Sequence, residues 1–148
     1  MPAGVKRLEL ARIRVCGRCG RGGAELRGGD GELLVVPLDA VRARQLSEAR
    51  TSDEARSLTD LVLEQLRAGG VVASEIVVDA AEGRLRALLS LLREEGPDVV
   101  VCTADEGVAL AVRGGLKIYA TDEALAYATA RSAKRERQGG AGGPDTIH

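Results

Sequence analysis

Apolar and polar residues alternate along residues 6–15, and this period of two predicts a β-strand with one side buried. The alternation changes phase at Ala11, which indicates a β-bulge. Residues 16–23 are too rich in glycine for a regular element, and residues 28–31 form a strong turn signal before the apolar run 32–36. We therefore expect two or three short antiparallel strands in this part of the chain.

Several later segments have the features of helices. The spacing of apolar residues is close to helical at residues 39–48, and a helix is also expected over residues 105–113. Thr59 is a suitable N-cap for a helix that ends at Gly69–Gly70, and residues 121–123 begin a last helix. About three of these helices are expected to pack on one sheet.

Three runs rich in β-branched residues predict further strands at residues 71–79, 99–102 and 117–120, and the valines of the second run suggest that it is buried. Residues 84–93 are ambiguous. The spacing of their leucines favours a helix, whereas the turn signals on both sides are those of hairpins. Together these elements indicate an α+β fold, in which a twisted mixed sheet carries the helices.

Composition narrows the class of protein. The chain has 148 residues, of which 45% are hydrophobic and 29% charged, as in globular domains. Because Phe and Trp are absent, aliphatic residues and alanine must fill the core. We expect a single domain at residues 1–130 and a basic, glycine-rich, disordered tail at residues 131–148. No apolar run could span a membrane, and no signal peptide is evident, so a cytoplasmic location is expected.

Charge is distributed unevenly along the chain. Residues 1–29 carry seven basic and two acidic side chains, whereas residues 30–129 carry ten basic and eighteen acidic ones. Arg12, Arg14 and Arg18 are therefore candidates for holding the phosphates of a nucleic acid without reading its sequence. The same arginines could equally form the solvated face of a strand.

The spacing of two cysteines is compatible with a zinc site. Cys16 and Cys19 are separated by two residues, as in half of a zinc ribbon. Cys102 could be a third ligand only if folding brings it close, and a symmetric dimer could instead pair two turns into a four-cysteine site. The alternatives are a reducible turn or a hairpin that happens to contain two cysteines.

Candidate catalytic groups are restricted to carboxylates. The only histidine is His148, the last residue, which excludes a histidine base, and no phosphate-binding loop of the P-loop type is present. Clustered carboxylates can hold Mg²⁺ or Mn²⁺ for phosphodiester cleavage. The candidates for such a metal site are Asp79, Asp98, Asp105 and Glu106. In the competing interpretation, Asp105 caps the helix at residues 105–113 and Glu106 interacts with the dipole of that helix.

Residues 108–113 (VALAVR), followed by Ile118-Tyr119, resemble the signature of the bifunctional nuclease domain family, which has an acidic turn, an Ala-Leu-Ala helix and an Ile-Tyr strand. Residues 36–40 (VPLDA), 56–61 (RSLTDL) and 82–87 (EGRLRA) are similar to further segments of that family, in the same order. The resemblance covers residues 8–128. It implies that residues 84–93 form a strand rather than a helix.

The resemblance also implies an activity. It suggests a metal-dependent nuclease of low sequence specificity on DNA or RNA, with Asp105 and Glu106 catalytic, and Asp79 joining them as a metal ligand. We expect the protein to self-associate through exposed sheet or helix surfaces. Thr103 and Ala104 stand where the family has arginine and proline, and a hydroxyl cannot replace a guanidinium fork. The alternative is therefore a non-catalytic binding or regulatory module with the same fold.

Overall fold

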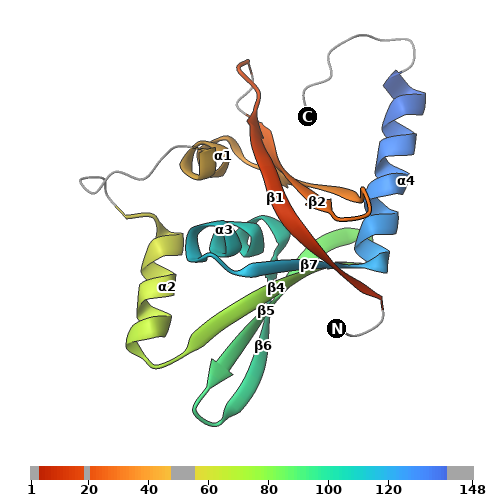
Figure 1. Cartoon of the computed structure of the whole chain (residues 1–148). Helices are drawn as coiled ribbons and strands as arrows, with labels where there is room; N and C mark the ends of the chain where they lie inside the picture. Colours follow the sequence, from red (N-terminus) through yellow and green to blue (C-terminus); the bar gives the residue numbers. More distant parts are fainter. Residues whose placement is uncertain (1–3, 19–20, 48–55, 140–148) are drawn as a thin grey trace.

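Seven strands form one continuous sheet, and helices pack around it (Figure 1). The computed structural model describes residues 4–18, 21–47 and 56–139. The elements in these residues are β1 (Val5–Val15), β2 (Gly22–Gly28), β3 (Leu33–Leu38), α1 (Ala40–Ser47), α2 (Leu58–Ala68), β4 (Val72–Ala81), β5 (Arg84–Arg93), β6 (Gly96–Thr103), α3 (Ala104–Gly114), β7 (Lys117–Thr121) and α4 (Asp122–Gly139).

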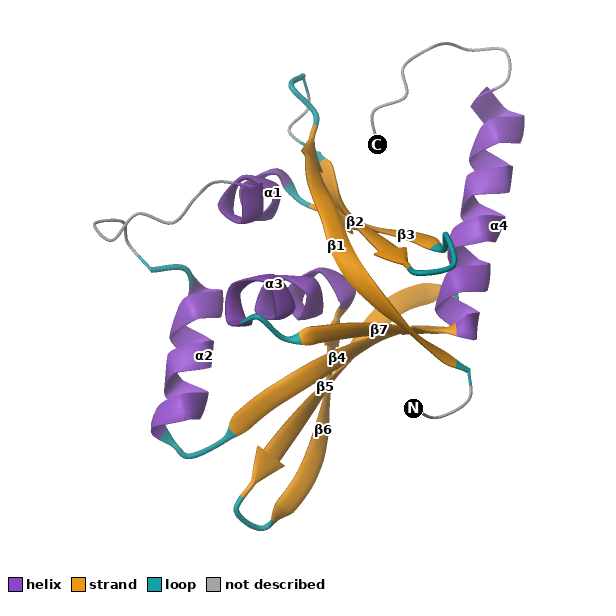
Figure 2. Ribbon diagram, in the orientation of Figure 1, coloured by secondary structure: helices purple, strands orange, loops and turns teal. Residues whose placement is uncertain are grey.

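The strand order is β3-β2-β1-β7-β4-β5-β6. Neighbouring strands are antiparallel except for β4 and β7, which run parallel, so the sheet is mixed. Helix α3 connects the edge strand β6 to β7 in the middle of the sheet (Figure 2). The expected α+β fold on one sheet is confirmed, with four helices in the described residues. None of these helices has the length and apolar character needed to cross a membrane.

The bulge expected in the first strand is present. The register between β1 and β2 shifts between Leu10 and Arg12, where the sequence alternation changes phase. The extra residue lets Leu8 before the bulge and Ile13 after it both pack with the core.

Strand β5 confirms the interpretation that the family resemblance favours for residues 84–93. Ala87, Leu89 and Leu91 are buried, which is the alternation of a strand with one buried side. A two-residue turn at Glu82 and Gly83, both with positive φ, joins β4 to β5. Pairing with strands on both sides outweighs the helical spacing of the leucines, because tertiary contacts override local propensity.

Helix α3 is the centre of the core. Small and aliphatic side chains on this helix pack against the sheet, in agreement with a core that lacks large aromatic residues. Gly107 lies so close to β5 that an added Cβ would be 2.3 Å from the Cβ of Ala87. The buried residues of α3 are Ala104, Gly107, Val108, Ala109, Leu110 and Ala111.

Several local expectations are wrong. The N-cap of α2 is Ser57, whose hydroxyl accepts the Asp60 amide hydrogen at 3.2 Å, and not Thr59. The N-cap of α3 is Thr103, so Asp105 lies in the first turn of the helix. Helix α4 continues past residue 130 to Gly139, and residues 140–148 of the expected tail lie outside the described residues.

Strand β6 is not buried as its valines suggested. Val99, Val100 and Val101 are 57%, 39% and 58% exposed. The reason is topological, because β6 is the last strand of the sheet and pairs only with β5 among the described strands. A continuous apolar run indicates a strand, but it does not distinguish a central position from an edge.

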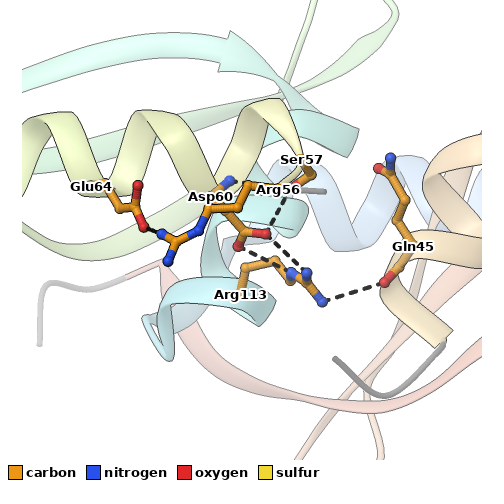
Figure 3. A network of polar contacts seen from close by, with 6 residues as sticks. All are labelled: Gln45, Arg56, Ser57, Asp60, Glu64 and Arg113. Carbon is orange, nitrogen blue, oxygen red and sulfur yellow. Dashed lines mark hydrogen bonds and ion pairs between the residues drawn. The ribbon is translucent and has the colours of Figure 1, made fainter. Parts of the chain in front are cut away.

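A buried ion pair connects the helices (Figure 3). The guanidinium of Arg113, at the end of α3, donates to both carboxylate oxygens of Asp60, at 3.3 and 3.0 Å. Ser57 donates to the same carboxylate at 3.0 Å, and Arg113 also reaches the Gln45 carbonyl oxygen at 3.5 Å. The pair therefore joins α2 to α3 and α3 to α1.

Replacing Gly107 by alanine is expected to destabilise the protein by about 1–3 kcal/mol, because the added methyl group overlaps Ala87 on a buried strand. Urea unfolding measures this change. Gly69→Ala is the matched control, since its added Cβ would be 3.5 Å from the nearest atom and should change stability by less than about 0.5 kcal/mol. Equal unfolding midpoints for the two variants would contradict the close packing of α3.

Replacing Arg113 by methionine is expected to cost about 3–5 kcal/mol, because it removes the guanidinium that contacts both oxygens of the buried Asp60 carboxylate. Arg113→Lys should recover only part of this stability, since an ammonium group cannot make the two-point contact. Arg67→Met, at the exposed end of α2, is the control. If all three variants unfold at the same urea concentration, the ion pair contributes nothing to stability.

Candidate functional site

Two segments on either side of the β5–β6 hairpin meet in a pocket of about 600 Å³. One is the β4–β5 hairpin, and the other is the junction between β6 and α3. The pocket is lined by Ala81, Glu82, Arg84, Leu85, Arg86, Val101, Cys102, Thr103 and Glu106.

The pocket combines two cations with two carboxylates. Arg84 and Glu82 come from the hairpin, and Glu106 comes from the first turn of α3. These three residues are exposed, and no ion pair joins any of them to another residue in the described ranges. Arg86 is partly buried, and the Asp79 carboxylate holds its guanidinium in place. The charged groups of Arg84, Glu82 and Glu106 are thus available to a ligand.

Asp79 positions Arg86. Its carboxylate accepts hydrogen bonds from Arg86 at 3.1 Å and from the Thr121 hydroxyl at 2.8 Å. Burial acts to raise the pKa of Asp79, but the hydrogen bonds from Thr121 and Arg86 outweigh it and lower that pKa. The Thr121 hydroxyl also accepts the Ala124 amide hydrogen at 3.1 Å, at the start of α4. Asp79 is therefore part of a hydrogen-bond network that fixes the guanidinium beside the pocket.

Asp105 and Glu106 differ in position although they are adjacent in sequence. Glu106 lines the pocket, whereas Asp105 is half-buried in the same helical turn and is not among the lining residues. Burial raises the pKa of the Cys102 thiol, and the negative charges of Glu106 and Asp105 raise it further. Cys102 is consequently a protonated thiol at neutral pH and a poor nucleophile.

The carboxylates predicted to bind a metal do not converge as a complete set. No group of three or more potential ligands occurs within the described residues. Asp98 lies at the far end of β6, paired with Arg93 at 3.1 Å. The pocket is lined by two carboxylates, those of Glu82 and Glu106, and protein sites for Mg²⁺ commonly use one or two carboxylates together with water and substrate phosphates.

Sequence reasoning missed Glu82, although a signal for it exists. The Glu-Gly pair forms the β4–β5 turn, and Glu82 adopts φ 53°. That conformation costs a residue with a side chain about 1–2 kcal/mol, and asparagine, aspartate or glycine are favoured there. Glu82 adopts this conformation at the turn and lines the pocket.

The zinc hypothesis is not supported by the part of the site that is described. Cys19 lies outside the described residues, and Cys16 is buried at the end of β1. Cys102 lies on β6, with β7, β4 and β5 between it and β1 in the sheet. The third ligand considered for this site is therefore remote from Cys16.

A second cationic surface lies on β1 and β2. Three arginines surround the Glu25 side chain, which is only 2% exposed. Arg12 contacts it at 2.9 Å, Arg27 at 3.7 Å, and Arg14 also forms an ion pair with it. Arg12 and Arg14 thus neutralise the buried Glu25 carboxylate, whether or not they also bind a ligand. Arg18 is exposed in the turn that follows β1.

Glu25 is expected to make the protein sensitive to acid. Burial acts to raise the pKa of Glu25, but the hydrogen bond from Arg12 and the charges of Arg14, Arg12 and Arg27 lower it overall. A carboxyl group with a lowered pKa stabilises the fold above its unfolded pKa of about 4.3, and this contribution disappears as the pH falls through the folded pKa. Stability should therefore fall on acidification below about pH 4.3.

Urea midpoints between neutral pH and acid would measure this dependence. Glu25→Gln should show a smaller decrease in stability on acidification than the wild type, because it cannot take up the proton. Glu9→Gln, an exposed position on β1, is the control. Parallel pH profiles for the wild type and Glu25→Gln would show that the arginines do not stabilise the charged form.

Comparison of the chain with models of known protein families found no match, and no curated protein matches it either.

Proposed function

We propose that this protein is a metal-dependent, nuclease-like protein that acts on DNA or RNA with low sequence specificity. The observation that supports this proposal is the pocket that joins Arg84 and Arg86 to Glu82 and Glu106. Cleavage of a phosphodiester without a histidine base can use cationic side chains that hold the phosphate and carboxylates that hold a divalent metal ion. Residues 82–87 of the hairpin are similar to a segment of the bifunctional nuclease domain family, and Glu106 belongs to the acidic turn before the Ala-Leu-Ala helix.

In this proposal the arginines hold the phosphate. A guanidinium presents several N–H groups in a plane, which suits two-point contact with phosphate oxygens. Arg86 is oriented by Asp79, so it loses less side-chain freedom on binding than an unrestrained arginine would. Thr103 makes no side-chain capping bond to α3, so its hydroxyl and the first N–H groups of the helix can also contact an anion.

Glu82 and Glu106 would hold the cation. When bound, Mg²⁺ or Mn²⁺ lowers the pKa of a coordinated water and stabilises the negative charge that develops on the phosphate. The chain's own contribution is to place Glu106 on a rigid helix and Glu82 on a tight turn, on two sides of one pocket. No sequence-reading contacts are required, which agrees with low specificity.

The alternative is a binding or regulatory module without hydrolysis. Two observations favour it: Thr103 provides a hydroxyl in place of a guanidinium, and the described residues lack a third clustered carboxylate. Arg12, Arg27 and Arg18 are exposed, and their charges could hold a phosphate backbone. Binding without cleavage is the outcome that this alternative requires.

The proposal extends to partners and location. Besides nucleic acid, the expected partner is a second copy of the chain, and the exposed valines of β6 support this self-association. A cytoplasmic location, as the sequence suggested, belongs to the same proposal.

Glu106→Gln is expected to lower metal-dependent cleavage of a labelled oligonucleotide by about 100-fold or more, since changes even beyond the direct metal ligands cost 10–100-fold. Its affinity for the oligonucleotide should stay the same or rise slightly, because a negative charge is removed. Glu123→Gln is the matched control, as Glu123 is also an exposed glutamate in the first turn of a helix. Excess chelator should abolish cleavage by the wild type.

Arg84→Ala should weaken binding of all sequences and reduce the dependence of affinity on salt, by roughly 0.7–0.9 in the log–log slope for each phosphate that is no longer neutralised. Binding without cleavage by the wild type would favour the binding-module alternative. Cleavage that survives in Glu106→Gln or in chelator would show that the pocket is not the catalytic site.

A further inference from the structure

Strand β6 forms one edge of the sheet. It pairs with β5 on one side and packs against α3 on one face, and no described element lies on its other side (Figure 2). The backbone N–H and C=O groups along that side are therefore available to another strand. An edge strand in this condition can pair with a strand of another chain.

The side chains of β6 are unusual for an edge in contact with water. Natural edge strands are commonly protected by lysine, by a bulge or by a covering element. Here three consecutive valines, Val99, Val100 and Val101, are exposed, and Leu92 on the neighbouring strand is 54% exposed. The only charge within β6 is Asp98, which Arg93 neutralises at 3.1 Å. The composition of the strand favours coverage by another apolar strand.

We propose that two copies of this chain pair through β6, antiparallel and in a register centred on Val100, so that the two sheets become one. This proposal specifies the surface for the self-association proposed above, and it does not depend on hydrolysis. In this register Val99 of one copy lies opposite Val101 of the other. A two-fold axis passes between the two Val100 residues, as in most homodimers.

The orientation of the backbone supports this register. Pro97 has no N–H, and a proline within a paired strand directs its nitrogen away from the partner strand. Because backbone groups alternate along a strand, Val99 and Val101 point their N–H and C=O groups to the same side as Pro97, which is the free edge. In the single chain the Val99 N–H donates to the Asp98 carboxylate at 2.8 Å, a local bond that a second strand would replace. Val99 and Val101 would exchange hydrogen bonds with the second copy, and Val100 would form a pair without hydrogen bonds.

The same register is compatible with the charges. Asp98 lies opposite the thiol of Cys102 from the other copy, so no two like charges are directly opposed. Pro97 falls opposite Thr103, at the end of the shared ladder, where its missing donor costs least. A strand of another protein would need to match this pattern, whereas a second copy matches it by symmetry.

The pairing would place each pocket next to the interface. Val101, Cys102 and Thr103 line the pocket and belong to β6. The start of the second copy's β6 would therefore lie beside the pocket of the first. The two-fold axis would then relate two such pockets, each beside the interface.

A single cysteine on the axis tests the register. In Val100→Cys the two Cα atoms would be about 4.5 Å apart, as in a pair without hydrogen bonds, which is within the range of about 4.4–6.8 Å for disulfides. The full chain should therefore form a disulfide-linked dimer in glutathione buffer. Leu92→Cys, also exposed but on β5, should not, and neither should the wild type with its own cysteines.

Non-covalent association is measured by sedimentation of two matched variants. Val101 and Val72 are equally exposed, at 58% and 57%, but Val72 lies at the start of β4 and not at the edge. Val101→Lys should weaken dimerisation about tenfold or more, because each change alters two symmetric cross-strand pairs. Val72→Lys should leave the dimer unchanged. Circular dichroism confirms that both variants are folded.

The possible outcomes distinguish pairing through β6 from association through another surface and from a monomer. Crosslinking of Val100→Cys alone, together with monomers of Val101→Lys, supports β6 pairing. If Leu92→Cys crosslinks, or if only Val72→Lys weakens the dimer, the chains associate through a surface other than β6. A wild-type monomer at all concentrations overturns both. None of these results changes the interpretation of the cleavage assay.

Discussion

The close approach of α3 to β5 is the constraint on which the rest of the structure depends. At Gly107 the helix lies so near the sheet that even a methyl group would overlap Ala87. A core without phenylalanine or tryptophan makes this distance necessary, because small side chains fill the space only when the layers lie close together. The same packing sets the position of the first turn of α3, and with it the position of Glu106 in the pocket.

Buried charges secure the elements around this core. Asp60 and Arg113 join α2 to α3, and Glu25 is held beneath three arginines of β1 and β2. Such pairs are costly to break once buried, so they fix geometry more than they add stability. Asp60 and Arg113 are thus explained by folding alone, whereas the hairpin and the β6–α3 junction line the pocket.

Strand β6 belongs to two surfaces at once. Its last residues line the pocket, and its valines form an exposed edge. In the proposed pairing, a second chain at this edge would also border the pocket. This arrangement follows from the strand order, in which the last strand before α3 is also the last strand of the sheet.

The sequence by itself determined the class of fold, the bulge at Ala11 and the aliphatic core, because periodicity and composition act locally and leave clear patterns. It also predicted Glu106 as a site residue, because an acidic turn follows a strand there, and this role stays a prediction. Tertiary structure alone decided that β6 is an edge, since a valine run has the same pattern in the centre and at the border of a sheet. It likewise decided that Asp79 orients Arg86 across the β4–β5 hairpin and that Glu82 and Glu106 line the same pocket, because these placements depend on strand pairing and on the position of α3.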